Sequence, residues 1–271
     1  MLIRTRTPQM QAPVIVKLGG SAITNKAKNC TARLEVVHNA IAEIASYSGR
    51  LVLLHGGGSF AHPFVSRDAL RNGFKQESQL ISVSEIELNL DQLTRIIGVG
   101  LLLRHRPFVP LGPMSFMTLR GDQVGKWFPA PITAALQLGL IPLIHGDIAF
   151  DETRGCGIVS ADRIASLLAE KIGVQKVLFG CDVDGLFDGN PKTSSRAKLI
   201  DQVDRGNYSK VLKGLKPSKG DVTGGMRGKA EEALRLAKHG CECYIFNLTK
   251  PSNLRKLLTG SSSVGTRFVP W

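Results

Sequence analysis

Long hydrophobic segments are missing from this 271-residue chain. No apolar run approaches the roughly 20 residues that a membrane-spanning helix requires. Residues 1–11 carry two arginines, but no apolar stretch long enough for a signal peptide follows them. We therefore expect residues 1–11 to form a disordered leader, and we expect a cytoplasmic protein that does not insert into membranes.

Cysteines with metal-binding or redox spacing are also absent. Cys30, Cys156, Cys181, Cys241 and Cys243 form no CxxC pair, and no cluster of histidine and cysteine has zinc-site spacing. Small buried thiols are common in proteins of reducing compartments. We expect all five cysteines to be free, and we expect no metal held by protein side chains alone.

Aromatic residues make up only 6% of the chain, too few for an evident base-stacking platform. The net charge of +13 nevertheless suggests an anionic partner. Phosphorylated small molecules satisfy this charge as well as nucleic acid does, and no basic run has the density of a nucleic-acid-binding tail. We therefore expect no nucleic-acid partner, and much of the excess charge is expected to be solvated surface.

Apolar segments alternate with helical patterns along most of the chain. Several of these segments are apolar throughout, as in buried parallel strands. This alternation predicts an α/β fold with an open, mainly parallel sheet and helices on both faces. The expected strands cover residues 12–18, 51–55, 108–112, 140–146, 175–180 and 241–247.

Residues 147–159 read differently, as a hairpin around a polar turn. No linker or internal repeat divides the rest of the chain. We expect a single domain over 12–271, with an acceptor-binding lobe up to about residue 170 and a nucleotide-binding lobe after it.

Glycine-rich segments follow the first two expected strands. Lys17-Leu18-Gly19-Gly20-Ser21 is neither a Walker A loop, because its lysine precedes the glycines, nor a GxGxxG fingerprint. Its backbone N–H groups suit phosphate oxygens, but an ordinary tight turn fits this segment alone equally well.

The second glycine segment is His55-Gly56-Gly57-Gly58-Ser59-Phe60-Ala61-His62. Three consecutive glycines are entropically costly, and a structural turn rarely needs three. They favour a second phosphate contact that faces the first loop. His62, just beyond the glycines, is interpreted as functional, and His55, at the strand end, as structural.

Two further segments suit a nucleotide. Residues 221–229 contain Gly224, Gly225 and Lys229 and precede a helix, whose N-terminus favours an anion. Asp182 and Asp184 follow the fifth expected strand, together with Gly185. They can face a nucleotide or its magnesium, or they can cap a turn.

These motifs, taken in order, carry a family resemblance. K-L-G-G-S-x-I-T-x-K, H-G-G-G-S-F-x-H-P, D-V-D-G, D-V-T-G-G-M-x-G-K and a terminal G-T-R-F together resemble the amino-acid kinase superfamily over residues 12–269. Within it, they resemble the isopentenyl phosphate kinase and fosfomycin kinase branch. The resemblance implies an αβα sandwich, ATP-dependent phosphorylation of isopentenyl phosphate to isopentenyl diphosphate in isoprenoid biosynthesis, and a homodimer. Mg²⁺ is expected because ATP reacts as its metal complex.

The matching positions imply a role for each residue. Those that would hold ATP are Lys17, Leu18, Gly19, Gly20, Ser21, Gly58, Asp182, Asp184, Gly185, Gly224, Gly225 and Lys229. Those that would face the acceptor are Gly57, His62, Ser160 and Ala161. Those that would act in catalysis are Lys17, Lys26, His62 and Lys229.

The sequence departs from the family pattern at two acceptor-side positions. Ala61 stands where the family has glycine before the histidine, and Ala161 replaces the glycine of an S-G-D step. The segment 63–110, which should supply the apolar wall of the acceptor site, matches poorly and aligns only around Glu87. These departures bear on the acceptor more than on the kinase reaction.

The chemistry of the loops favours a phosphate acceptor. A phosphate monoester is mostly dianionic at neutral pH and needs no general base. None of the glycine loops presents an Asp or Glu placed to deprotonate an alcohol. Two alternatives stay open: a sister kinase acting on fosfomycin, another phosphate or phosphonate, or an amino-acid carboxylate, and a non-catalytic module that binds ATP.

Overall fold

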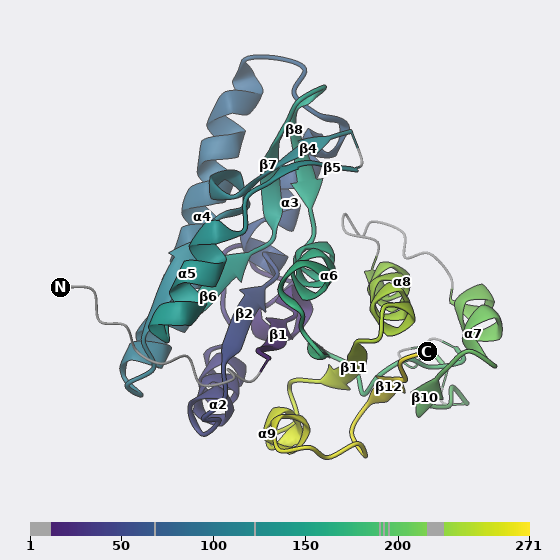
Figure 1. Ribbon diagram of the computed structural model, residues 1–271. Coiled ribbons are helices and arrows are strands. Elements are labelled where there is room, and N and C mark those ends of the chain that lie inside the picture. The colour runs from purple at the N-terminus through teal and green to yellow at the C-terminus, as the bar shows by residue number, and fades with distance from the viewer. Residues whose placement is uncertain are drawn as a thin grey trace.

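The structure is a computed structural model, shown in Figure 1. It describes residues 12–67, 69–121, 123–189, 191, 193–194, 196–215 and 225–271. The expected leader at 1–11 and the candidate residue Gly224 lie outside the described residues.

An eight-stranded sheet forms the centre of the molecule, in the order β10-β12-β11-β9-β1-β2-β6-β3. The strands from β11 to β3 are parallel, whereas β12 runs antiparallel to β11, with β10 parallel to β12. Their bounds are Val14–Leu18 (β1), Leu51–His55 (β2), Phe108–Leu111 (β3), Ile141–His145 (β6), Lys176–Cys181 (β9), Gln202–Val203 (β10), Glu242–Asn247 (β11) and Thr266–Phe268 (β12). The six expected strands are therefore β1, β2, β3, β6, β9 and β11.

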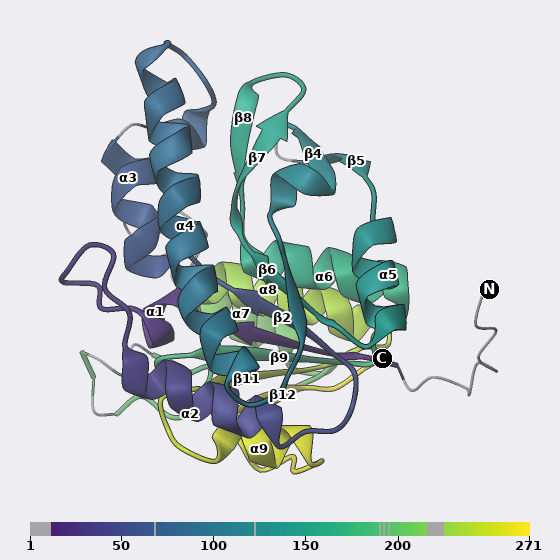
Figure 2. The ribbon, with the colours of Figure 1, turned by 90° about the vertical axis from the view of Figure 1, so that its left-hand side faces the viewer.

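Helices cover both faces of this sheet, and side chains that alternate along each strand meet one layer or the other (Figure 2). Ile15 packs with one layer and Val16 with the opposite one. The first layer contains α5 (Ala130–Leu138), α6 (Ala161–Ile172) and α8 (Gly225–Lys238). The second contains α1 (Gly20–Ile23), α2 (Leu34–Ala45), α4 (Ser78–Leu102) and α9 (Asn253–Leu258). The predicted α/β fold, with a mainly parallel sheet and helices on both faces, is confirmed.

A second, four-stranded sheet stands beyond the carboxyl ends of the central strands, at the top of Figure 1, in the order β5-β4-β7-β8. The expected hairpin is confirmed as β7 (Asp147–Asp151) and β8 (Gly155–Val159). The partner hairpin, β4 (Met117–Arg120) and β5 (Gln123–Trp127), was not predicted. Every described side chain of β5 is at least partly exposed, so the alternation of apolar residues that marks a strand is weak there.

A small third core lies between the β7–β8 hairpin and the helices α3 (His62–Arg67) and α4. Phe64, Ile86 and Ile148 are buried in it. The remaining short helices are η1 (Gly58–Phe60), η2 (Leu70–Asn72), η3 (Pro113–Ser115) and α7 (Tyr208–Gly214). Within the described ranges, no helix has both the length and the apolar character to cross a bilayer.

Candidate active site

The carboxyl ends of β1, β2 and β9 bring the glycine segments to one edge of the central sheet. Leu18 pairs with His55 on one side and with Gly180 on the other. The loops that begin at Gly19, Gly56 and Asp182 therefore leave the sheet side by side. Ligands of open parallel sheets bind at this edge.

The first two loops pack backbone against backbone. A Cβ atom built on Gly20 would lie 2.5 Å from the amide nitrogen of Gly58, and one built on Gly58 would collide with the Thr24 hydroxyl. Gly58 also has a φ of 53°, in the left-handed region that favours glycine. The Thr24 hydroxyl accepts a hydrogen bond from the Ser59 amide at 3.0 Å. Geometry thus requires glycine at position 58, and a Cβ atom on Gly56 would lie 3.0 Å from the amide nitrogen of Gly20, which is a tight contact.

Two buried lysines meet a single buried carboxylate beside these loops. The Lys17 ammonium, at the end of β1, forms an ion pair with Oδ1 of Asp162 at 2.9 Å. The Lys229 ammonium, on α8, donates a hydrogen bond to Oδ2 of the same residue at 2.7 Å. All three residues are less than 8% exposed, so water screens their charges weakly. Two positive charges therefore flank one carboxylate next to the glycine loops, where Cε of Lys17 lies 3.7 Å from the Cβ position of Gly56.

The environment of this triad shifts all three pKa values. Burial lowers the pKa of Lys17 to about 8, helped by the Lys229 charge and opposed by Asp162. Burial also acts to lower the pKa of Lys229, but the Asp162 carboxylate outweighs it and raises that pKa. Burial acts to raise the pKa of Asp162, yet the two ammonium groups lower it to about 2. At neutral pH, Asp162 is therefore an anion with little capacity to accept a proton.

Asp162 is the residue that sequence reasoning left out of the site. It lies in the first turn of α6, directly after Ser160 and Ala161, which were included. Ser160 is the N-cap of α6, where its hydroxyl accepts a hydrogen bond from the Arg163 amide at 3.0 Å. Ala161 is buried, and its amide nitrogen lies against Gly146. The signal that could have found Asp162 was the third position of the same S-A-D step.

The carboxylates of the segment after β9 are held on the other side of the first loop. Asp182 accepts a hydrogen bond from the Ser21 hydroxyl at 2.9 Å. Asp184 accepts hydrogen bonds from Asn247 and Lys250, both at 2.9 Å, and these bonds lower its pKa. Gly185 lies against Thr266 of β12, too close for a side chain. Asp182 thus borders the glycine loop, whereas Asp184 ties this segment to the end of β11 and the turn after it.

The remaining candidates take different positions. His62 is the first residue of α3 and is partly buried. Lys26 is exposed on the turn after α1 and joins none of the contacts of the buried triad. Gly57, between Gly56 and Gly58, has helical backbone angles. Gly225 is the first residue of α8 and has a φ of 60°. The structure therefore assembles Lys17, Lys229 and the first two glycine loops, and leaves Lys26 at the surface.

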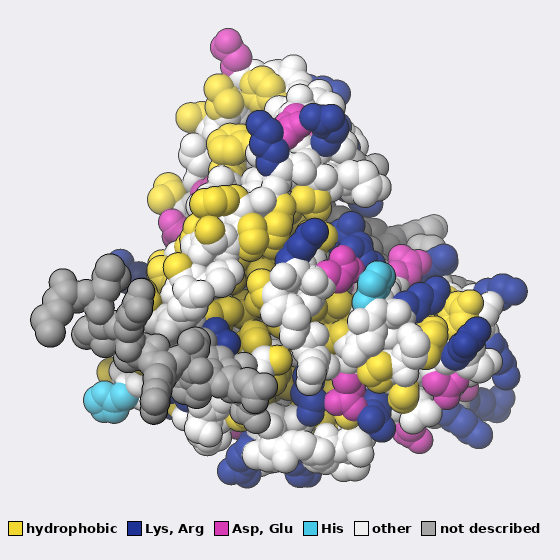
Figure 3. Space-filling view, in the orientation of Figure 1, with side chains coloured by type: hydrophobic (Ala, Val, Ile, Leu, Met, Phe, Trp, Pro, Cys, Tyr) yellow, Lys and Arg dark blue, Asp and Glu magenta, His cyan; other side chains and the backbone are white. Residues whose placement is uncertain are grey.

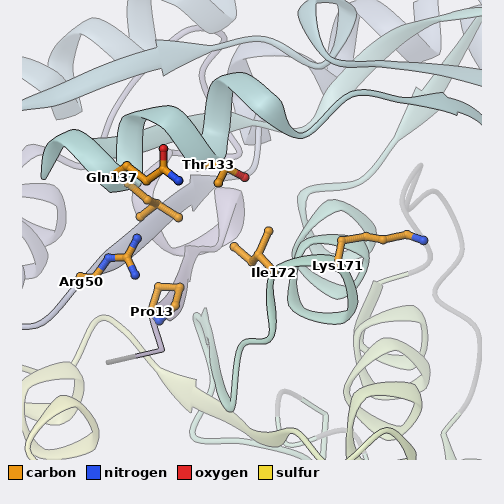
Figure 4. Close-up of a pocket in the computed structure, with 7 residues that line it drawn as sticks. Pro13, Arg50, Thr133, Gln137, Lys171 and Ile172 are labelled. Carbon is orange, nitrogen blue, oxygen red and sulfur yellow. The ribbon is translucent and has the colours of Figure 1, made fainter. Parts of the chain in front are cut away.

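The described residues hold no cluster of three side chains suited to bind a metal ion. A cavity of about 300 Å³, lined by Arg50, Thr133 and Ile172 among others, lies instead at the amino-terminal edge of the central sheet (Figure 4). Pro13 lines it just before β1, so this cavity and the glycine loops lie at opposite ends of the strand. On the face shown in Figure 3, lysine and arginine side chains gather over α7 and α8.

Comparisons with known proteins agree with this geometry. The amino acid kinase family profile matches residues 12–247. An isopentenyl phosphate kinase of Methanothermobacter thermautotrophicus is 30% identical over 94% of this chain and 98% of the relative. That of Methanocaldococcus jannaschii is 31% identical over 91% and 95%, respectively. A crystal structure of isopentenyl phosphate kinase superposes with a TM-score of 0.81 at 28% identity, covering 94% of this chain and 99% of that one. By sequence and by fold, the chain belongs to the amino acid kinase family.

Proposed function

We propose that this protein is an isopentenyl phosphate kinase, which transfers the γ-phosphoryl group of ATP to isopentenyl phosphate and releases ADP and isopentenyl diphosphate. The observation that carries the proposal is the buried Lys17–Asp162–Lys229 triad beside two apposed glycine loops. The relatives reported above, named isopentenyl phosphate kinase, match almost the whole chain.

The triad suits a reaction between two highly charged phosphates. An oxygen of the acceptor phosphate attacks the γ-phosphorus of ATP, and the bond from that phosphorus to the bridging oxygen of ADP breaks. A dianionic acceptor needs no base, but the repulsion between donor and acceptor must be offset. The two ammonium groups supply positive charge, and the glycine amides supply N–H donors. Asp162 holds both lysines in place and does not itself take a proton.

Each loop receives a role within this proposal. Lys17, Gly19, Gly20 and Ser21 contact the ATP phosphates, with Lys229 on their far side. Gly58 faces the donor, and Gly57 faces the acceptor. His62 donates a hydrogen bond to the acceptor phosphate. Lys26, on its exposed turn, reaches the transferring group only when the substrates are bound.

The remaining candidate residues lie on the nucleotide side or on the acceptor side of the proposed site. We assign the border of the nucleotide to Asp182, Asp184, Gly185, Gly224 and Gly225. Ser160 and Ala161 adjoin the acceptor side. Mg²⁺ bound with ATP would offset part of the negative charge of the phosphates, and it usually takes only one or two ligands from the protein in such sites. Among the described residues, Asp182 is a carboxylate placed beside the phosphate loop and able to contact such an ion.

A phosphate acceptor fits better than an alcohol because the Asp162 carboxylate beside the two lysines is a poor proton acceptor. An alcohol requires a base, and Asp162 is ion-paired with both lysines, which lower its pKa to about 2. Carboxylate acceptors need no base either, so this argument does not distinguish a phosphate acceptor from a carboxylate acceptor. An activity assay with both classes of acceptor makes that distinction. The alternative of a non-catalytic ATP-binding module does not explain why two lysines are buried at the phosphate edge.

The proposed enzyme has two lobes and pairs with a second copy of itself. We assign acceptor binding to the part before about residue 170 and nucleotide binding to the part after it, within one cytoplasmic domain. Ile81, Leu88 and Leu102 lie on one face of α4 and are 74%, 70% and 57% exposed. Such an apolar stripe favours contact with a second copy, as a homodimer would provide. Sedimentation velocity over a range of protein concentrations tests this assembly.

A coupled assay of ADP release tests the function directly. The acceptors compared are isopentenyl phosphate, dimethylallyl phosphate, fosfomycin, N-acetylglutamate, glutamate and a nucleoside monophosphate. We expect the highest kcat/KM with isopentenyl phosphate. Strong turnover with a carboxylate acceptor alone contradicts the proposed acceptor, and tight ATP binding without any turnover supports the non-catalytic alternative.

A further inference from the structure

Two buried histidines end neighbouring strands of the central sheet, just below the acceptor-side glycine loop. His55 is the last residue of β2, and His145 is the last residue of β6. They are register partners, and their ring centroids are 6.0 Å apart. His55 is fully buried and directly precedes Gly56, Gly57 and Gly58. Its side chain is thus the last one before the loop leaves the sheet.

His55 reaches across to the middle of α4. Its Nε2 lies 2.8 Å from the hydroxyl of Thr94, which is also buried. The Thr94 hydroxyl in turn donates to the carbonyl oxygen of Leu90 at 2.9 Å. The Thr94 hydroxyl has one proton and donates it to Leu90, so Thr94 accepts from His55 and the histidine carries its proton on Nε2. The other ring nitrogen, Nδ1, lies 3.5 Å from the carbonyl oxygen of Gly56, beyond the usual N–H···O distance, so this contact does not require a second proton. Burial lowers the pKa of His55 to about 3, helped by the neighbouring His145, so this ring is neutral at physiological pH.

The second histidine makes no comparable link. His145 Nε2 is 3.8 Å from Oε2 of Glu87, longer than a hydrogen bond, and its Nδ1 is buried without a hydrogen-bond partner. Thr94 and Glu87 are two helical turns apart on the same helix. Of the two histidines, His55 is therefore the one hydrogen-bonded to α4.

We propose that His55 is a positioning residue for phosphoryl transfer: its Nε2–H···Thr94 hydrogen bond fixes the loop of Gly56, Gly57 and Gly58 relative to α4. The inference rests on the proposed function, in which Gly57 faces the acceptor. α4 also contributes Ile86 to the small core beside His62, so the same helix supports both sides of the acceptor site. Because Gly58 packs on Gly20, a shift of this loop would misalign the acceptor with ATP, whereas ATP itself is held in the proposed function mainly by Lys17, the loop after it and Lys229.

Substitutions at Thr94 test the link without altering the glycine loop. Thr94→Val removes the hydroxyl and keeps the shape, whereas Thr94→Ser keeps the hydroxyl. The matched control is Thr133→Val in α5, because the Thr133 hydroxyl donates to the Pro129 carbonyl four residues back and has no histidine partner. We expect Thr94→Val to lower kcat/KM for the acceptor about tenfold, with KM for ATP within about twofold of wild type. Thr94→Ser and Thr133→Val should retain wild-type kinetics.

The histidine itself is observed by long-range ¹H–¹⁵N NMR of the wild-type protein, assigned with His55→Gln. We expect a neutral ring protonated on Nε2 that does not titrate between about pH 5 and 8. An Nδ1-protonated or titrating ring overturns the proposal, as does wild-type acceptor kinetics in Thr94→Val, which would make the link purely structural. Lack of wild-type turnover with isopentenyl phosphate contradicts the proposed function instead, and the NMR result is independent of that outcome.

Discussion

Lys17 and Lys229 share the two oxygens of one buried carboxylate, that of Asp162. One lysine ends the first strand of the sheet, and the other lies in the first turns of α8. Two buried ammonium groups would repel one another without the anion between them. The Asp162 carboxylate therefore stabilises two ammonium groups close to one another in a buried site. We expect these two positive charges to bind the negatively charged phosphates of the substrates.

Replacement of Asp162 by asparagine should impair both folding stability and turnover. Asp162→Asn leaves two buried lysines without a counter-charge, and removal of one partner from a buried ion pair typically costs about 3–5 kcal/mol. We expect a lower free energy of unfolding, and a kcat reduced about 10²-fold or more because the lysines lose their orientation. Urea unfolding and steady-state kinetics measure the two effects.

Glu170→Gln is the matched control for this substitution. Glu170 lies on the same helix α6 and forms a two-pronged ion pair with Arg235 of α8, at 2.6 and 2.8 Å. It joins the same two helices as Asp162 does, but at their opposite ends. A modest loss of stability with unchanged kcat is expected for Glu170→Gln. Equal kinetic effects of the two substitutions would show that Asp162 acts only by joining α6 to α8.

The pH dependence of ATP use should report the Lys17 ammonium. Its pKa is lowered to about 8, chiefly by burial, whereas that of Lys229 is raised. Because Lys17 binds phosphate as a cation, kcat/KM for ATP should fall as pH rises through about 8. The folded pKa lies below the unfolded value of 10.5, so the folded state binds fewer protons between the two values and gains stability there as pH rises.

Loss of activity above pH 8 would therefore not result from unfolding caused by this group. Thermal unfolding recorded across the same pH range checks that point. A kcat/KM for ATP that stays constant up to about pH 10 would show that Lys17 remains charged, or that its charge is not needed.

His62→Ala should reduce turnover without unfolding the protein. Loss of one electrostatic contact to the reacting group typically costs about 10²–10³ in rate. We expect a loss of that size for isopentenyl phosphate and a far-UV circular dichroism spectrum like that of wild type. His38→Ala, at an exposed position of α2, is the control. Near-wild-type turnover of His62→Ala would remove this residue from the site.

Lys26→Ala tests whether an exposed turn contributes to catalysis. Lys26 and Lys28 lie on the same exposed turn after α1 and carry the same charge. If Lys26 reaches the transferring group in the bound complex, Lys26→Ala should lower kcat about 10²-fold. Lys28→Ala should change it little. Equal, small effects of both substitutions would indicate a general contribution of surface charge.

The central sheet could be predicted because its strands are almost entirely apolar, as in LVLLH at β2 and IPLIH at β6, each polar only at its final histidine. Both strands are fully buried between helix layers, so the pattern and the environment agree. The β4–β5 hairpin escaped prediction because its side chains are half-exposed, and its role depends on β7, which is distant in the chain. Tertiary position, rather than local pattern, decides that element.

In the candidate site, too, features set by local sequence could be predicted and features set by tertiary contacts could not. The glycine loops and both lysines carry local motifs, so they could be identified from the sequence. The partnership of Asp162 with Lys17 and Lys229 joins three separate elements, and no local pattern states which carboxylate lies between which lysines. The link from His55 to Thr94 is of the same kind. The sequence suggested a structural role for His55, and the structure identifies Thr94 of α4 as its hydrogen-bond partner, with His55 as the donor.

The most direct test of the proposed function is ³¹P NMR of a reaction containing the purified protein, ATP, Mg²⁺ and isopentenyl phosphate. We predict that the monophosphate signal is replaced by the two coupled signals of a diphosphate monoester as ADP accumulates. Absence of that diphosphate with a correctly folded protein, together with turnover of a carboxylate acceptor under the same conditions, would contradict the proposed phosphorylation of isopentenyl phosphate.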